Sequence, residues 1–223
     1  MFFSMIRLWK KISLRDLAAL NKGDGYEAHR LIWGLFADRA DRKRDFLYRH
    51  ENLKGWPTFY AVSKREPKDT SGMWEVHSKP YCPKLNQGQR LAFTLRANPI
   101  RSKRDENGRQ HRHDVIMEAK THLGSQGEKF HESEVVQMHG ERWLLERCSC
   151  LGFTVSPGGL RADGYRQHGL IKGKGNPLIT FSTLDFNGIL TVTDPQKFVK
   201  ECLFKGIGPA KAFGCGLMLV RRI

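Results

Sequence analysis

The sequence predicts an α+β fold made of two domains, and three observations support this prediction. The chain has 223 residues, a length that suits one large domain or two domains of about 100 residues each. Residues 1–100 read as strand, helix, strand, strand, weak helix and strand, which is the split βαβ order of a ferredoxin-like domain. The second half repeats this theme less regularly, so we expect a second α+β domain at residues 101–223.

The elements of the first domain follow from hydrophobic patterning and turn residues. The predicted helix has Asp24 as a candidate N-cap and Glu27 in the capping-box position. Gly55 and Pro57 indicate a turn between two strands, and Pro99 ends the last strand. In chain order, the segments are 1–12 (strand), 26–36 (helix), 44–51 (strand), 58–66 (strand), 71–78 (short and ambiguous) and 89–99 (strand).

The second domain begins with a strongly basic loop and is rich in glycine. Asp194 is a candidate N-cap, and Pro195 occupies the first helical position after it. In chain order, the segments are 101–112 (basic loop), 115–123 and 134–148 (helices), 153–174 (glycine-rich and basic), 178–194 (two strand-like runs), 195–204 (helix) and 214–223 (strand).

The charge of the chain points to a polyanionic partner. The chain has 38 Lys and Arg against 23 Asp and Glu, a net charge of +15. With no amphipathic basic helix in view, we favour nucleic acid over a membrane surface. The sequence contains no apolar run of about 18 residues, so it predicts no membrane-spanning helix. The N-terminal apolar stretch precedes its charged residues, which is the reverse of the order in a secretory signal. The five irregularly spaced cysteines favour a reduced, cytoplasmic protein.

One face of the helix predicted at 26–36 carries residues suited to catalysis. Tyr26 and His29 are three positions apart, close enough to act on one group. A histidine, with an unperturbed pKa of about 6.5, exchanges protons near neutral pH. A solvated face with incidental aromatic residues is an equal alternative on the pattern alone. The helical wheel separates a core stripe (Ala28, Leu31, Ile32, Leu35) from the opposite cluster (Tyr26, His29, Arg30, Trp33).

Two glycine-rich segments are candidates for phosphate contacts. Residues 206–216 fail the dinucleotide pattern G-x-G-x-x-G because Lys211 replaces its last glycine. Their glycines nevertheless allow close backbone approach, and Lys211 supplies charge. The alternatives are a tight loop here and a mobile surface loop at 158–174. Residues 158–174 combine glycines with basic residues that can contact RNA phosphates, namely Arg161, Arg166, His168, Lys172 and Lys174.

Two short pairs raise the question of zinc, namely His111 with His113 and Cys148 with Cys150. Neither pair has the usual ligand spacing and the two are not clearly joined, so we favour structural roles for them. The sequence also lacks the paired acidic residues of a two-metal nuclease and the motifs of serine hydrolases and zinc proteases. We therefore predict neither a metal nor a cofactor.

Three segments carry a family resemblance: GYEAHR at 25–30, FTLRANP at 93–99 and GIGPAKAFGCGL at 206–217. The last is preceded by a strand of the type F-x-G-x-L-x-V-x-D at 186–194. Together, in this order and across nearly the whole chain, they resemble the CasE family, the CRISPR repeat-processing endoribonucleases of type I-E Cascade.

The resemblance implies two tandem ferredoxin-like (RRM-like, βαββαβ) domains. It also implies binding of the CRISPR repeat stem-loop in precursor crRNA and one metal-independent cut at the 3′ base of the stem. The ribose 2′-hydroxyl is the nucleophile, and the protein then stays on the crRNA with the other Cascade subunits. The alternative, a non-catalytic basic RNA-binding protein with RRM-like domains, would leave that hairpin uncut in EDTA.

Carried onto this chain, the resemblance makes Tyr26 and His29 the expected catalytic pair. His29 is expected to act as general base or general acid, and Tyr26 as a neutral hydrogen-bond donor or partner in proton transfer. A nearby cation would stabilise the charged transition state. The residues expected to bind RNA are Arg30, Arg161, Arg166, Lys172, Lys174 and Lys211.

Overall fold

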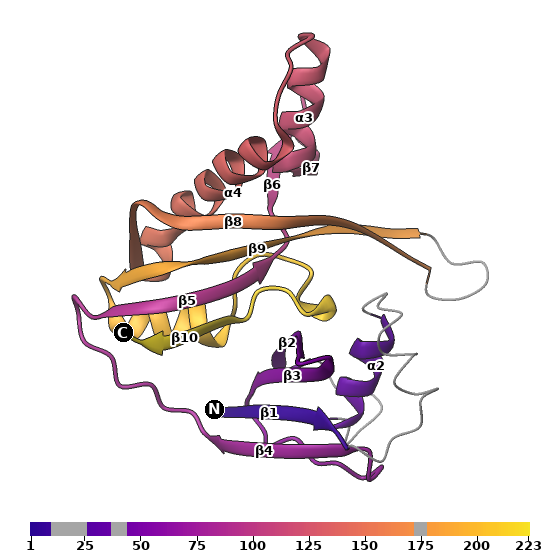
Figure 1. Cartoon of the computed structure of the whole chain (residues 1–223), viewed down its shortest axis with the longest axis vertical. Coiled ribbons are helices and arrows are strands. Elements are labelled where there is room, and N and C mark those ends of the chain that lie inside the picture. Colours follow the sequence, from indigo (N-terminus) through magenta and orange to yellow (C-terminus); the bar gives the residue numbers. More distant parts are fainter. Residues whose placement is uncertain (10–25, 37–43, 172–177) are drawn as a thin grey trace.

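A computed structural model describes residues 1–9, 26–36, 44–171 and 178–223. Two four-stranded antiparallel sheets lie face to face, one built from strands within residues 2–80 and the other from strands within residues 90–222 (Figure 1). Helices project from the sheet of the second half, at the top of Figure 1. The fold is therefore α+β with two domains, as the sequence predicts.

The first sheet has the strand order β2-β3-β1-β4, with every neighbouring pair antiparallel. This is the order of a ferredoxin-like domain, but residues 64–73 between β3 and β4 contain no helix. The weak helix expected at the ambiguous segment 71–78 is therefore wrong, and this segment contributes most of β4. The elements are β1 (Phe2–Leu8), α2 (Tyr26–Gly34), β2 (Phe46–Leu53), β3 (Trp56–Ser63) and β4 (Trp74–Pro80).

The turn between β2 and β3 shows why local sequence fixes this hairpin. Lys54 and Gly55 both have positive φ, 54° and 79°, as a two-residue type I′ turn requires. Pro57 lies inside β3, not in the turn. The N-cap expected at Asp24 lies outside the described residues.

The second sheet has the order β10-β5-β9-β8, which is again the ferredoxin-like order. Here helical segments occupy both crossovers, before β8 and before β10. Asp194 caps the second crossover, as predicted, by accepting from the backbone N–H of Lys197. The elements are β5 (Arg90–Ala97), β8 (Phe153–Ile171), β9 (Leu178–Val192), α5 (Pro195–Lys197), the π-helical η2 (Phe198–Phe204), η3 (Lys211–Phe213) and β10 (Met218–Arg222).

Strand β5 corrects one expectation. It pairs with β10 and β9 and not with a strand of the first sheet, so the strand expected at 89–99 does not close the first domain. Its alternating pattern shows that one face is buried, but alternation does not identify the partner strand. We therefore propose to divide the domains between β4 and β5, within residues 81–89, instead of at residue 100.

A helical arm is inserted between β5 and β8. The basic segment 101–112, expected as a loop, forms most of an antiparallel hairpin. The Asp114 carboxylate accepts from the backbone N–H groups of Ile116 and Met117 and so caps the first helix. The arm consists of β6 (Ile100–Arg104), β7 (Gln110–Asp114), α3 (Val115–Ser125), α4 (Glu132–Cys148) and the short η1 (Ser149–Leu151).

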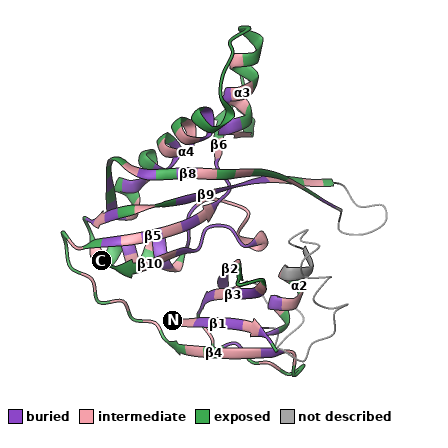
Figure 2. Cartoon of the chain, viewed as in Figure 1, coloured by how far each residue is buried: buried purple, intermediate pink, exposed green. Residues whose placement is uncertain are grey.

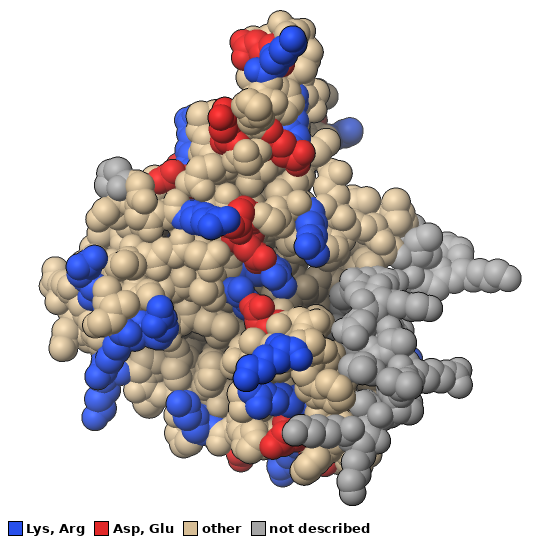
Figure 3. Space-filling view, viewed as in Figure 1, with Lys and Arg blue, Asp and Glu red and all other residues tan. Residues whose placement is uncertain are grey.

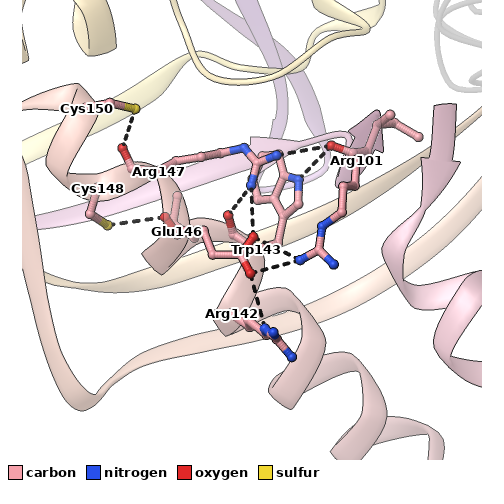
Figure 4. A network of polar contacts seen from close by, with 9 residues as sticks. Arg101, Arg142, Trp143, Glu146, Arg147, Cys148 and Cys150 are labelled. Atoms are coloured by element: carbon pink, nitrogen blue, oxygen red, sulfur yellow. Dashed lines mark hydrogen bonds and ion pairs between the residues drawn. The ribbon is translucent and has the colours of Figure 1, made fainter. Parts of the chain in front are cut away.

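A polar network inside this arm ties β6 to α4 (Figure 4). The Trp143 indole donates to the Ile100 carbonyl at 3.0 Å, and the Arg147 guanidinium lies 4.3 Å from the centre of the Trp143 ring. Glu146 accepts from Arg101 at 2.9 Å. Because Trp143 is only 1% exposed, its bond fixes β6 against α4 in a setting where an unmade hydrogen bond would cost about 1–3 kcal/mol.

The two domains bury separate cores and share a third cluster. Helix α2 covers one face of the first sheet, while the helices of the second domain cover one face of the second. The other face of the first sheet packs on the second domain through Leu47, Val62 and Leu217. Figure 2 shows the corresponding buried bands along both sheets. Full burial of one such side chain contributes about 1.5–3 kcal/mol, so the shared cluster holds the domains together.

Candidate functional site

His29 lies half-buried where α2 meets β2. Its ring centroid is 5.7 Å from Trp33 and 6.3 Å from Tyr48. The wheel correctly predicts a buried stripe, since Ile32 and Leu35 are 0% and 5% exposed. Trp33 is not on an open face, however, because its ring packs 5.7 Å from Phe46. A wheel treats the side away from the core stripe as solvent and cannot register that β2 passes there.

Tyr26 opens α2, and its side chain lies outside the described residues. Its position three residues before His29 is the helical spacing on which the sequence prediction rests. The pairing of these two side chains remains a prediction.

The glycine-rich loop of the second domain reaches the first domain beside His29. The Tyr48 hydroxyl donates to the Ala212 carbonyl at 2.9 Å, and burial raises the pKa of Tyr48, so it stays a donor. Gly214 follows with φ +81°, and a Cβ there would lie 3.3 Å from the Tyr48 ring. Glycine is thus needed for both the turn and the close approach, and η3 is held beside α2.

This contact brings two cations to the His29 region. Burial lowers the pKa of Lys211, and repulsion from Arg44 and Lys205 lowers it further. Burial likewise lowers the pKa of Arg44, which interacts electrostatically with Tyr48. An anion placed between these cations would relieve their repulsion. The junction of α2 and η3 is therefore suited to a phosphate group, with His29 on its α2 side.

Sequence analysis identified His29 and Lys211 separately but missed Arg44 and Tyr48. Both residues lie in the segment predicted as a strand at 44–51. Neither position has a motif or spacing that signals this role, because Lys211 joins the three residues of the first domain only through a contact between the domains.

The other predicted RNA-binding residues that the structure describes are exposed. Arg30 is exposed on α2, while Arg161 and Arg166 are exposed on β8. Arg161 forms an ion pair with Asp163 at 2.6 Å, which neutralises part of its charge. Lys172 and Lys174 lie outside the described residues. The glycine-rich basic segment 158–174 is, up to Ile171, part of a strand that pairs with β9 with two register shifts.

The wider surface is compatible with a long anionic partner. Figure 3 shows Lys and Arg side chains on both domains, with Asp and Glu side chains among them, and the chain as a whole has a net charge of +15. Within the described ranges, no three or more His, Cys, Asp or Glu side chains cluster as metal ligands would. The Cys148 and Cys150 thiols donate to backbone carbonyls of α4 instead (Figure 4). None of the described helices is long and apolar enough to cross a membrane.

The fold and site define a class: two ferredoxin-like domains with a histidine and cations near the contact between them. The chain belongs to the family described as CRISPR associated protein, whose sequence pattern matches residues 1–222. This confirms the CasE-family resemblance seen in its motifs.

Two characterised relatives match most of the chain. The CRISPR system Cascade subunit CasE of Escherichia coli K12 is 29% identical over 199 residues, covering 87% of this chain and 90% of that protein. The CRISPR-associated endoribonuclease Cse3 of Thermus thermophilus is 28% identical over 226 residues, covering 92% of each.

Solved structures match the fold over the full length. Cse3 bound to a 19-nucleotide RNA superposes with a TM-score of 0.71 at 24% identity, covering 99% of this chain and all of that one. Cas6e from Escherichia coli K-12 superposes with a TM-score of 0.65 at 23% identity, covering all of both chains. The tandem ferredoxin-like fold expected from the motifs is thus confirmed.

Proposed function

We propose that this chain is a metal-independent endoribonuclease that processes precursor crRNA in the cytoplasm. It binds the stem-loop of the CRISPR repeat, cuts once at the 3′ base of the stem and stays on the crRNA with the other Cascade subunits. The observation that carries the proposal is the approach of Lys211 and Arg44 to the junction of α2 and η3, where His29 packs near Tyr48, in a chain whose relatives include an endoribonuclease and a Cascade subunit.

Cleavage of RNA by its own 2′-hydroxyl needs groups that take up and supply protons. The 2′-hydroxyl attacks the adjacent phosphorus and gives up its proton, while the 5′-oxygen leaves and takes up a proton. The products are a 2′,3′-cyclic phosphate and a 5′-hydroxyl. His29 exchanges one of these protons, a role that contributes typically about 10²–10⁴-fold, and Tyr26 donates a hydrogen bond or takes part in the proton transfer.

The cations act on the charge that develops at phosphorus. Attack by the 2′-oxygen gives a phosphorane-like state with an additional negative charge. Lys211 and Arg44, held by the fold before RNA arrives, stabilise that charge without reorganising. Arg30, Arg161, Arg166, Lys172 and Lys174 are proposed to contact RNA phosphates, which position the stem without reading its sequence.

Cleavage of the repeat hairpin from the host genome in EDTA tests the proposal. We expect a single cut that leaves a cyclic phosphate, at a rate that added magnesium does not change. RNA with 2′-deoxyribose at the cut nucleotide should bind with unchanged affinity and remain intact. Cleavage that stops in EDTA and returns with magnesium would contradict the proposal, and binding without any cleavage would favour the non-catalytic alternative.

A further inference from the structure

A cavity of about 600 Å³ lies against η3. The ends of β8 and β9, the junction of β5 with β6 and the glycine-rich loop form its walls. Phe213 of η3 lines this cavity, whereas the neighbouring Ala212 carbonyl accepts from Tyr48 at the junction of α2 and η3. A ligand in the cavity is thus one residue of this turn away from the candidate catalytic region.

Three aromatic rings form a parallel pile in the cavity wall. His168 and Phe181 face each other across the β8–β9 ladder with ring centroids 4.7 Å apart and planes inclined by 15°. Phe181 and Phe213 stack at 4.6 Å with the same inclination. Because Phe181 lies between the other two, each terminal ring keeps one face for a further flat group. Successive bases of single-stranded RNA stack on such platforms.

The terminal His168 ring is held in place and is suited to stacking. Its Nε2 lies 2.9 Å from the Thr183 hydroxyl. Burial lowers the pKa of His168, and the charges of Arg166 and Arg96 lower it further. The ring is therefore neutral near pH 7, so a stacked base meets a flat, uncharged surface.

Asn98 gives the cavity a polar group that can read a base edge. It lines the cavity, is 4% exposed, and its buried Oδ1 has no hydrogen-bond partner among the described residues. Leaving such an acceptor unpaired is unfavourable, so a buried group of this kind calls for an explanation. An amino or imino group of a nucleobase would satisfy it.

The charges around the cavity favour a nucleotide over a protein side chain. Arg112 lines the cavity, and Arg166 lies close enough to His168 to affect its titration. The one carboxylate in the wall, Asp114, already accepts from the backbone of α3 and from the Tyr165 hydroxyl. The cationic groups are thus available to the phosphates that flank a bound base.

We propose that this cavity binds one unpaired nucleobase of the RNA that the chain cleaves, stacked on the His168–Phe181–Phe213 pile and hydrogen-bonded to Asn98. The inference rests on the proposed function and adds a nucleotide-recognition subsite to it. Bases outside a stem can be splayed out and stacked on aromatic side chains, whereas paired bases cannot. The subsite therefore selects for a base beside the stem.

Protein and RNA substitutions tested together separate this subsite from general RNA binding. The probe is the host repeat hairpin with 2′-deoxyribose at the cut nucleotide and a single abasic site at each unpaired flanking position in turn. We expect one abasic position to weaken binding. We expect His168→Ala or Phe213→Ala to weaken binding of the intact probe by roughly 5- to 150-fold, the range for one base–aromatic stack, and to add nothing on that abasic probe.

Asn98→Ala provides a variant that tests the subsite without disturbing the pile. Because the Asn98 acceptor is unpaired in the free protein, its thermal midpoint should stay within a few degrees of the parent while affinity falls roughly 2- to 10-fold. Phe130→Ala removes an exposed phenylalanine from the arm and serves as the matched control, with unchanged affinity.

Each outcome decides the inference. If the affinity lost through the protein substitution and the affinity lost through the abasic site simply add, the subsite is overturned. It is also overturned if neither change lowers affinity while the parent still cuts the repeat. Both results leave the proposed function intact. Variants that bind RNA normally but no longer assemble with the other Cascade subunits would assign the cavity to a protein partner and also overturn it. A parent chain that neither binds nor cuts the repeat contradicts the proposed function itself.

Discussion

The two domains have the same strand order but differ in what covers their sheets. The first sheet has one described helix, α2, on one face and the second domain on the other. The second sheet has helical segments at both crossovers and a long β8–β9 ribbon. The first domain therefore presents its helix, with His29, to the glycine-rich loop of the second. We propose that the first domain supplies proton transfer through His29, and that both domains supply charge, through Arg44 of the first and Lys211 of the second.

Removal of a single atom, the hydroxyl oxygen of Tyr48, breaks the hydrogen bond between the first domain and the glycine-rich loop. Tyr48→Phe removes the hydroxyl that donates to Ala212 and leaves that carbonyl without its partner, which costs about 1–3 kcal/mol. We expect a lower thermal midpoint and slower cleavage, with a smaller change in RNA affinity, because η3 loses its fixed position beside α2. Thermal unfolding and single-turnover rates measure both effects.

Tyr60→Phe is the matched control for that variant. Tyr60 stacks on Phe3 in the shared cluster between the domains. The Tyr60→Phe variant should leave both the thermal midpoint and the cleavage rate nearly unchanged. Equal behaviour of the two variants would show that the Tyr48 hydroxyl does not position the loop.

The recognition role of the second domain is tested by its basic ribbon. Replacing Lys172 and Lys174 together with Ala should weaken affinity several-fold and reduce the slope of log affinity against log salt by roughly 1–2, because fewer phosphate contacts release fewer counterions. The control removes Lys197 and Lys200, exposed lysines of the second crossover. Affinity and slope that stay unchanged in the ribbon variant would remove these lysines from the interface.

The fold was predictable where local pattern decides it, and the site was not where distant segments meet. The elements of residues 1–63 and the helices of the arm follow from periodicity, and the start of the second crossover follows from its cap, Asp194. Strand 89–99 was placed in the wrong sheet because alternation carries no information about its partner. Lys211 and Arg44 come together only because Gly214 lets the loop approach Tyr48, and no spacing in the sequence expresses that contact.

The smallest expected effect is on the pH dependence of folding stability, through His50 of the first domain. Burial lowers the pKa of His50, and Arg96 of the second domain lowers it further. The folded chain thus binds fewer protons at this residue than the unfolded chain, so stability falls as pH drops below about 6.5, by at most about 1.4 kcal/mol per pH unit. His50→Gln should flatten this fall in urea unfolding between pH 7.5 and 5. The exposed His131→Gln should retain it, and identical curves for His50→Gln and the parent would contradict the assignment.

The central claim is that His29 performs chemistry while other residues bind the RNA. Single-turnover cleavage and equilibrium affinity for the repeat hairpin, both measured on His29→Ala, test it most directly. We predict a rate lower by roughly 10²-fold or more and an affinity that changes far less, because the loss lies in the transition state. Thermal unfolding of the same variant confirms that it is folded. A folded variant that cleaves at the parent rate, or one that loses affinity as much as rate, would contradict the account.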